Sequence, residues 1–204
     1  GENEIYISQL IRNDLIDDFI IYITKNNISL TSQIYSSIFE TNEFLINKTP
    51  TFLEYATFYG SIQIFQYIKL NNIELTSSLW LYAIHGKNPD IIHLLEENKV
   101  NPKSYKECLI ESIKCHHNEI KEYFQNNYCN EINESDFDIL KQSIKSYNFI
   151  ELSHKIKFNI LKSNTFYYYL CKYDYIKFVQ LIINNNNNTQ IDINWQTKNE
   201  KRWR

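Results

Sequence analysis

Apolar residues recur along the chain in short groups with helical spacing, and polar stretches separate these groups. Leu79, Tyr82 and Ala83 follow the i, i+3, i+4 spacing that marks one face of a helix. The next group, IIHLL at residues 91–95, covers a broader face, as expected of a helix that packs against neighbours on two sides. The polar stretch HGKNPD lies between them. The pattern predicts two short helices joined by a turn.

The two-helix pattern is repeated along the sequence. Aligning Ala56 with Ala83 places apolar residues on apolar residues without a gap, and a third copy carries Ser112 at the same position. Such an ungapped match indicates an internal repeat. Weaker copies extend it to about seven helix pairs, with a second half of a unit at residues 17–30 and a first half at residues 31–40. We therefore predict a single array over residues 1–190, whose clearest copies are 50–75, 77–102 and 105–130.

Several helix starts carry recognisable capping residues. Thr51 and Glu54 have the spacing of a capping box, as do Ser104 and Glu107. Pro89 precedes the apolar group 91–95, and proline is favoured in the first turn of a helix. These signals predict helices that begin just after Thr51 and Ser104 and at Pro89.

Stacking of the helix pairs follows from their size. A short helix pair cannot bury its apolar face alone, so neighbouring pairs must stack to form a continuous core. The small residues at Ala56, Ala83 and Ser112 permit close approach between helices. We expect an all-α fold, an α-solenoid of helix-turn-helix repeats with short loops and little or no β-hairpin.

The repeated unit resembles the ankyrin repeat. The segment TFLEYATFYG keeps Thr51, Leu53, Ala56 and Gly60 at positions that match the family pattern T-P-L-H-x-A-A-x-x-G. The following GSIQIFQYIKLNN matches the second half, with an asparagine in place of the final glycine. The sequence of residues 52–100 is similar to that of a divergent ankyrin-like family of unknown function that is expanded in trichomonad protists. This resemblance implies a repeat scaffold that binds proteins, and it brings no catalytic residues.

The repeat is shorter than the usual ankyrin unit of about 33 residues. Only 27 residues separate Ala56 from Ala83, and 29 separate Ala83 from Ser112. The missing residues fall in the loops where ankyrin repeats extend β-hairpins, which favours tight turns here. The binding groove would then be formed by the first helices and the turns that follow them.

Composition and charge further limit the class of protein and the kinds of partner to be expected. The chain has 204 residues, with 43% hydrophobic and 22% charged residues, which is typical of a globular protein. Its three glycines and three prolines disfavour a hairpin-rich β fold. A net charge of −3 gives no general attraction for nucleic acid or anionic lipid. With no secretory-signal pattern near residues 1–19 and no disulfide-framework spacing, we expect a cytoplasmic protein.

The residues that could carry catalysis or bind a metal have simpler structural interpretations. Cys115, His116 and His117 could be zinc ligands with Cys108 or Cys129, but no C-x-x-C or H-x-x-x-H pair accompanies them. The repeat register instead places Cys108 in the core and residues 115–117 in a turn. A Cys–His pair could also act as a nucleophile and base, yet no orienting acid is visible in the sequence. We therefore expect no metal, no cofactor, no small-molecule substrate and no enzymatic activity.

Two sets of residues are candidates for partner binding. Phe58 and Tyr59 precede Gly60 at positions that face the groove in the resembled family, and His85 and Lys114 hold related positions in the next two copies. Exposed aromatic side chains in a groove are good anchors for a protein partner. The alternative for Phe58 is packing in the core.

The second set lies in a C-terminal tail, residues 191–204. This segment could direct the chain to nucleic acid or to an anionic membrane, as an accessory module, or it could be a solvated end or a helix packed on the last repeat. Its binding candidates are Trp195, Lys198, Lys201, Arg202, Trp203 and Arg204. Protein binding through the repeat groove remains the leading hypothesis.

Overall fold

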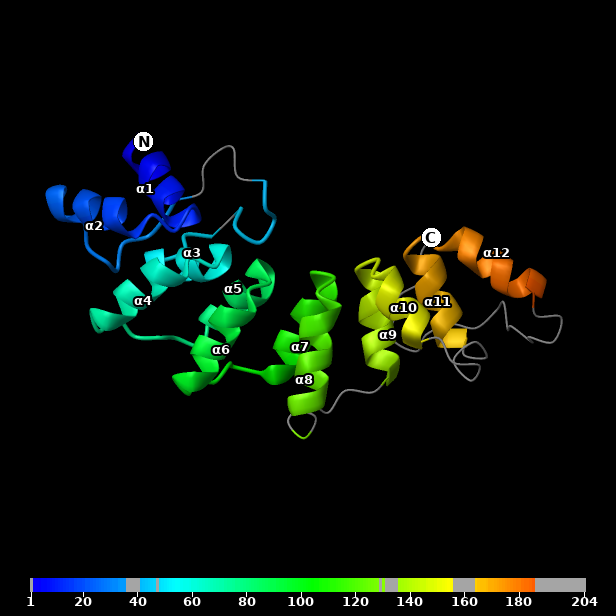
Figure 1. The fold of residues 1–204 in the computed structure, drawn as a ribbon. Coiled ribbons are helices and arrows are strands. Elements are labelled where there is room, and N and C mark those ends of the chain that lie inside the picture. The colour runs from blue at the N-terminus through cyan, green and yellow to red at the C-terminus, as the bar shows by residue number, and fades with distance from the viewer. Residues whose placement is uncertain are drawn as a thin grey trace. The chain divides into compact units, whose positions relative to one another are not determined.

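The computed structural model describes residues 2–35, 41–46, 48–128, 130, 136–155 and 164–185 (Figure 1). These residues form helices and turns and contain no β-strand, only an isolated bridge between Gln33 and Thr51. The predicted all-α class is confirmed. The helices are α1 (Glu2–Arg12), α2 (Ile16–Lys25), α3 (Phe52–Tyr59), α4 (Ile62–Leu70), α5 (Leu79–Gly86), α6 (Pro89–Glu97), α7 (Tyr105–Lys114), α8 (Asn118–Asn127), α9 (Asp136–Lys145), α10 (Phe149–Lys155), α11 (Asn164–Lys172) and α12 (Ile176–Asn185).

The chain divides into two compact units, Gly1–Glu131 and Ile132–Arg204. In the first unit α1 to α8 follow one another as four antiparallel pairs, and the first helix of each pair contacts the first helix of the next (Figure 1). Thus α1 packs on α3, α3 on α5, and α5 on α7. Residues 31–35 and 41–46 connect α2 to α3 and are not helical, so the half-unit predicted at 31–40 is not a helix over its described part.

One backbone feature is shared by all six described turns between the helices of a pair. Each turn contains one residue with a left-handed backbone, at φ between 51° and 70°. In five of the six turns the next residue donates a backbone hydrogen bond to the carbonyl five residues earlier, as in a Schellman motif. The left-handed residues are Asp14, Gly60, Lys87, His116, Tyr147 and Asp174. The turn is therefore defined by its backbone geometry, and only one of these positions uses glycine.

The predicted helix starts are present. Thr51 accepts a hydrogen bond from the Glu54 amide, and the Glu54 side chain accepts from the Thr51 amide, which completes the capping box. Ser104 caps α7 by accepting from the Glu107 amide, and Pro89 is the first residue of α6. Asn72, which stands where the ankyrin pattern ends in glycine, has φ 60°. These local features of the helix pairs are confirmed.

The pairs are also joined by hydrogen bonds that run from one pair to the next. The Asp14 carboxylate, in the first turn, accepts from the amides of Gln63 and Ile64 at 3.0 Å each, so it caps α4 of the next pair. Glu54 of α3 similarly accepts at 2.7 Å from Ser78, which precedes α5. Each of these bonds satisfies a polar group at a helix start from the neighbouring pair.

Small buried residues lie in the core of the first unit, as the alignment predicted. Ala56, Ala83 and Ser112 have no exposed surface, and each belongs to a first helix. Among the described residues Trp80 has the largest fully buried side chain, and its indole N–H donates to the Val100 carbonyl at 2.7 Å. A larger side chain at any of these small positions would have no space without moving a helix.

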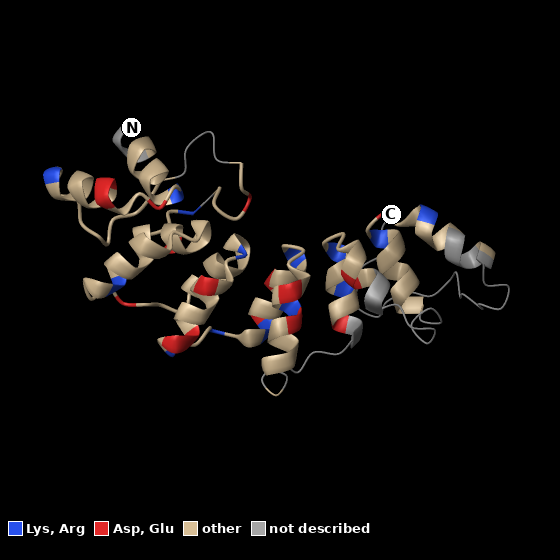
Figure 2. Cartoon of the chain, in the orientation of Figure 1, with Lys and Arg blue, Asp and Glu red and all other residues tan. Residues whose placement is uncertain are grey.

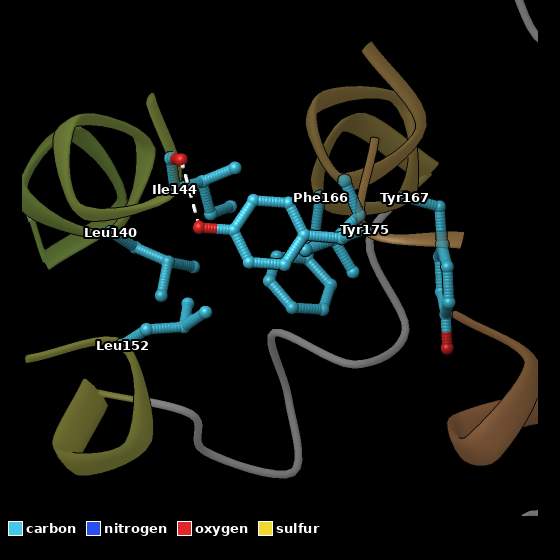
Figure 3. Close-up of a cluster of buried hydrophobic side chains, with 7 residues drawn as sticks. Leu140, Ile144, Leu152, Phe166, Tyr167 and Tyr175 are labelled. Carbon is cyan, nitrogen blue, oxygen red and sulfur yellow. Dashed lines mark hydrogen bonds between the residues drawn. The ribbon is translucent and has the colours of Figure 1, made fainter. Parts of the chain in front are cut away.

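The second unit has its own hydrophobic core. It is formed between α9, α10 and α11 and the turn before α12, and Figure 3 shows Leu140, Ile144, Leu152 and Phe166 around the ring of Tyr175. The Tyr175 hydroxyl donates at 3.0 Å to the carbonyl of Ile144. Burial raises the pKa of this phenol to about 12. The buried members of this core are Leu140, Ile144, Leu152, Phe166, Tyr167, Leu170 and Tyr175.

Candidate functional site at the ends of α3, α5 and α7

The carboxyl ends of α3, α5 and α7 lie next to one another because the first helices pack side by side. Gly86, the last residue of α5, makes part of this close approach possible. A Cβ atom at Gly86 would clash with the backbone carbonyl of Phe58 on α3. The "YG" of the first copy and the "HG" of the second therefore differ in role: Gly60 forms a left-handed turn, and Gly86 gives close contact between helices.

Three side chains with reactive heteroatoms meet between α5 and α7. The Nε2 atom of His85 lies 2.9 Å from Oε1 of Glu111, and the Sγ atom of Cys115 lies 3.3 Å from Nδ1 and 3.6 Å from Nε2 of the same ring. All three residues are partly buried, and their nearest donor atoms lie within 4.8 Å of one another. We call His85, Glu111 and Cys115 the His85 cluster.

A segment outside the repeats covers the ring of His85. Phe44, in the connection between α2 and α3, stacks on His85 with ring centroids 3.7 Å apart. The ammonium of Lys48 lies 3.3 Å from the centroid of the Phe44 ring, which is cation–π geometry. Burial lowers the pKa of Lys48. The Phe44 ring also stands edge-on to Tyr82 at 5.0 Å, so it holds this end of α5 in place.

A cavity of about 590 Å³ opens beside the His85 cluster. Its wall combines the 42–44 segment with the ends of α5 and α7, and Asn42 and Glu43 on its rim are exposed. Acidic and basic residues are interspersed along α7 and α8, which overlap in the view of Figure 2. The lining residues are Asn42, Glu43, Phe44, His85, Glu111, Lys114, Cys115 and His117.

The ionisable groups of the cavity influence one another. Hydrogen bonds from His85 and then Lys114 lower the pKa of Glu111 to about 2, against the opposing effect of burial. Lys114 reaches Oε2 of Glu111 at 2.9 Å, whereas His85 faces Oε1. Burial, reinforced by the Glu111 charge, raises the pKa of the Cys115 thiol to about 12. Burial also lowers the pKa of His117.

The His85 cluster contains the residue types of a nucleophile, a base and an orienting acid, but its geometry is not that of a catalytic triad. Sγ of Cys115 is almost equidistant from the two ring nitrogens, at 3.3 and 3.6 Å. A sulfur in line with one nitrogen lone pair would be much farther from the other nitrogen. The raised pKa also keeps the thiol protonated, whereas the thiolate is the nucleophile.

The residues predicted to bind a partner have different environments. Phe58 is only 8% exposed and stacks parallel to Phe44 at 6.1 Å, so the core interpretation applies and it is not an exposed anchor. Tyr59 is half-buried, with the Arg12 guanidinium 4.9 Å from its ring centroid. His85 and Lys114 do lie together, joined through Glu111.

The segment from Cys108 to His117 is arranged largely as the register predicted. Cys108 is buried in the core, Cys115 ends α7, and His116 adopts the left-handed turn conformation. The partner of Cys115 is His85 from the preceding pair, and not Cys108 or the adjacent histidines. Cys129 and the tail candidates Trp195, Lys198, Lys201, Arg202, Trp203 and Arg204 lie outside the described residues.

Sequence reasoning missed Phe44, Lys48 and Glu111. Glu111 precedes Cys115 by one helical turn, a spacing that places both side chains on one face of α7 and could have pointed to it. Phe44 and Lys48 follow no repeat position, so periodicity gave no signal for them.

Comparison of the chain with protein-family models, with curated proteins and with solved structures gives no match. None of the described helices combines the length and the hydrophobicity that crossing a bilayer demands.

Proposed function

We propose that this chain is a non-enzymatic scaffold, an ankyrin-like α-solenoid that binds a protein partner at the ends of α3, α5 and α7. The supporting observation is that two successive first helices, α5 and α7, pack on each other and end, together with the 42–44 segment, around one cavity of about 590 Å³. A surface built from equivalent positions of successive repeats is how repeat proteins present binding sites.

The chemistry of this surface favours a partner segment with polar side chains. Asn42 and Glu43 are exposed on the cavity rim, and 46% of the Lys114 side chain is exposed. A cavity of this size admits one or two side chains of a partner, with the rim providing hydrogen bonds.

The repeat scaffold itself is part of the proposal. The shared left-handed turns, the contacts between successive first helices and the buried small residues at Ala56, Ala83 and Ser112 support it. Tight turns in place of β-hairpins restrict the binding surface to the helix ends.

The test is affinity capture followed by direct binding of an identified partner to the purified chain. Lys114→Glu reverses a charge on the cavity wall and breaks the ion pair with Glu111, so we expect affinity to fall at least about tenfold. Lys106→Glu is the matched control, because Lys106 is exposed in the first turn of the same helix. Equal affinities of the wild-type chain and the Lys114→Glu variant, for every partner that binds directly, would refute this surface.

A further inference from the structure

The His85 cluster brings three metal-ligating atoms together from two helices that are neighbours in space. His85 is the penultimate residue of α5, Glu111 lies in the last turn of α7, and Cys115 directly follows that helix. An imidazole nitrogen, a carboxylate oxygen and a thiol sulfur are the three donor types that zinc takes in proteins. No short sequence motif contains all three residues, because 26 residues separate His85 from Glu111.

The donor atoms of the cluster lie within 4.8 Å of one another, close enough for one small ion after the side chains adjust. In a tetrahedral zinc site with bonds of about 2.0–2.3 Å, the ligand atoms lie about 3.3–3.6 Å from one another. Cys115 Sγ lies 3.6 Å from Nε2 and 3.3 Å from Nδ1 of His85, so it is off the line of the Nε2 lone pair, and the Cys115 side chain must rotate to share an ion with Nε2. Nε2 and Oε1 of Glu111 are 2.9 Å apart, so this pair must open by about 0.5 Å or less to admit the ion.

We propose that His85, Glu111 and Cys115 form a binding site for a divalent transition-metal ion of the zinc type, with a fourth coordination position open to the cavity. On binding, Nε2 of the neutral His85 ring gives its lone pair to the ion while the ring proton lies on Nδ1, and the Cys115 thiol releases its proton to solvent. The thiolate and the carboxylate together balance the charge of the dication.

The surroundings of the cluster hold its ligands in place. Lys114 binds Oε2 of Glu111 and leaves Oε1 directed toward His85. Phe44 stacks on the imidazole and restricts its rotation. His117 lines the same cavity and forms a hydrogen bond with the His85 backbone, so its ring is already engaged. Partners that orient ligands in this way strengthen metal sites.

The donor set also selects among metals. A thiolate and an imidazole favour Zn²⁺ and Co²⁺ over Mg²⁺ and Ca²⁺, which take oxygen ligands. The nearby ammonium groups of Lys114 and Lys48 oppose a dication, and Glu43 on the cavity rim favours it. The proposal goes beyond the scaffold function, since the ion would join α5 to α7 whether or not a partner is present.

The experiment is a titration of the chelator-treated full chain with Co²⁺, followed by displacement with Zn²⁺. We expect one ion per chain, a thiolate-to-cobalt charge-transfer band, the visible bands of four-coordinate cobalt, and loss of both on adding Zn²⁺. Mg²⁺ at the same concentration should have no effect. Zinc should also raise the thermal unfolding midpoint, because binding to the folded state stabilises it.

Matched variants assign the ligands. Cys115→Ser should abolish the charge-transfer band and weaken binding at least about tenfold, and Glu111→Gln should weaken it while keeping the band. The controls are Cys171→Ser and Glu107→Gln, since Cys171 is exposed in the second unit and Glu107 is exposed on α7. Circular dichroism in chelator shows that each variant is folded before titration.

Two results would overturn the proposal: no stoichiometric Co²⁺ or Zn²⁺ binding by the folded wild-type chain, or binding that Cys115→Ser leaves unchanged. Neither result depends on a partner. The scaffold function is tested separately by repeating the partner measurement in chelator, so the failure of one proposal is distinguishable from the failure of the other.

Discussion

Helix α5 makes two interfaces of different character. Toward α3, Gly86 lies directly against the Phe58 carbonyl, and Tyr82 is buried near Glu54. Toward α7, His85 forms a hydrogen bond with Glu111 and contacts Cys115 beside a cavity. Residues 85 and 86 are adjacent in sequence, yet Gly86 makes a close contact between two helices and His85 lines a cavity. The tight contact of Gly86 with α3 thus fixes the position of the neighbouring His85 side chain, which faces α7.

The largest expected effect comes from filling the space at the α3–α5 interface. Gly86→Ala puts a methyl group against the Phe58 carbonyl, a backbone atom that can move only if α3 and α5 separate. We expect the free energy of unfolding to fall by about 1–3 kcal/mol. Urea denaturation followed by circular dichroism measures it.

The matched change at the α5–α7 interface is Cys115→Ser, measured in chelator. It conserves volume beside a cavity, so we expect a loss of under about 1 kcal/mol. Equal losses for Gly86→Ala and Cys115→Ser would show that the two interfaces do not differ in packing.

A smaller effect is expected at alkaline pH from Tyr82. Burial, and then the Glu54 charge, raise its pKa above the ordinary value of 10.0. Because the folded state resists ionisation, the stabilising contribution is complete below about pH 10 and is lost as pH rises further, by up to about 1.4 kcal/mol per pH unit. Tyr82→Phe should therefore reduce the loss of stability between about pH 9 and pH 11.

Other buried tyrosines contribute to the same loss of stability at alkaline pH. The measurement therefore compares how steeply the free energy of unfolding falls with pH in each variant. The control is Tyr35→Phe, because Tyr35 is 59% exposed. If the two variants lose stability equally over this pH range, Tyr82 does not make the interface sensitive to alkali.

The smallest expected effect concerns the turns that follow α3 and α5. Lys87 has φ 52° where the preceding pair has Gly60 at φ 70°. A side chain in this conformation is strained, so Lys87→Gly should stabilise the chain by about 0.5–1 kcal/mol. Gly60→Ala should do the reverse and also clash with Asn88. Thermal melts of both variants check the opposite signs, and a loss of stability in Lys87→Gly would contradict this explanation of the turn.

Sequence reasoning found the features that depend on neighbouring residues. The capping box at Thr51 and Glu54 and the helix start at Pro89 each need only a few residues of local chain, so their signals are visible in the sequence. The buried alanines at 56 and 83 were visible because the repeat places them in register. Local geometry and periodicity were sufficient for the helices.

The candidate site depended on contacts that are distant in sequence. Phe58 was predicted as a possible exposed anchor because no nearby residue in the sequence indicated that its ring would be covered. Phe44 stacks on it from the connection between α2 and α3, which lies outside the repeat. His85 and Cys115 belong to different pairs, and only the packing of α5 on α7 brings them together. The sequence contains the residues of the cluster, but the distance between them is a tertiary property.

The near absence of glycine from the shared turns has a consequence for the unfolded chain. Glycine gives the denatured state more backbone freedom than any other residue, and this freedom is lost on folding. With Asp, Lys, His and Tyr at five of six left-handed positions, the unfolded chain is more restricted and loses less entropy when it orders. In exchange, the left-handed conformation costs a side-chain-bearing residue up to about 1–2 kcal/mol, and less for Asp14 and Asp174. The stability of the chain is therefore set partly in its denatured state, where none of the contacts described above exist.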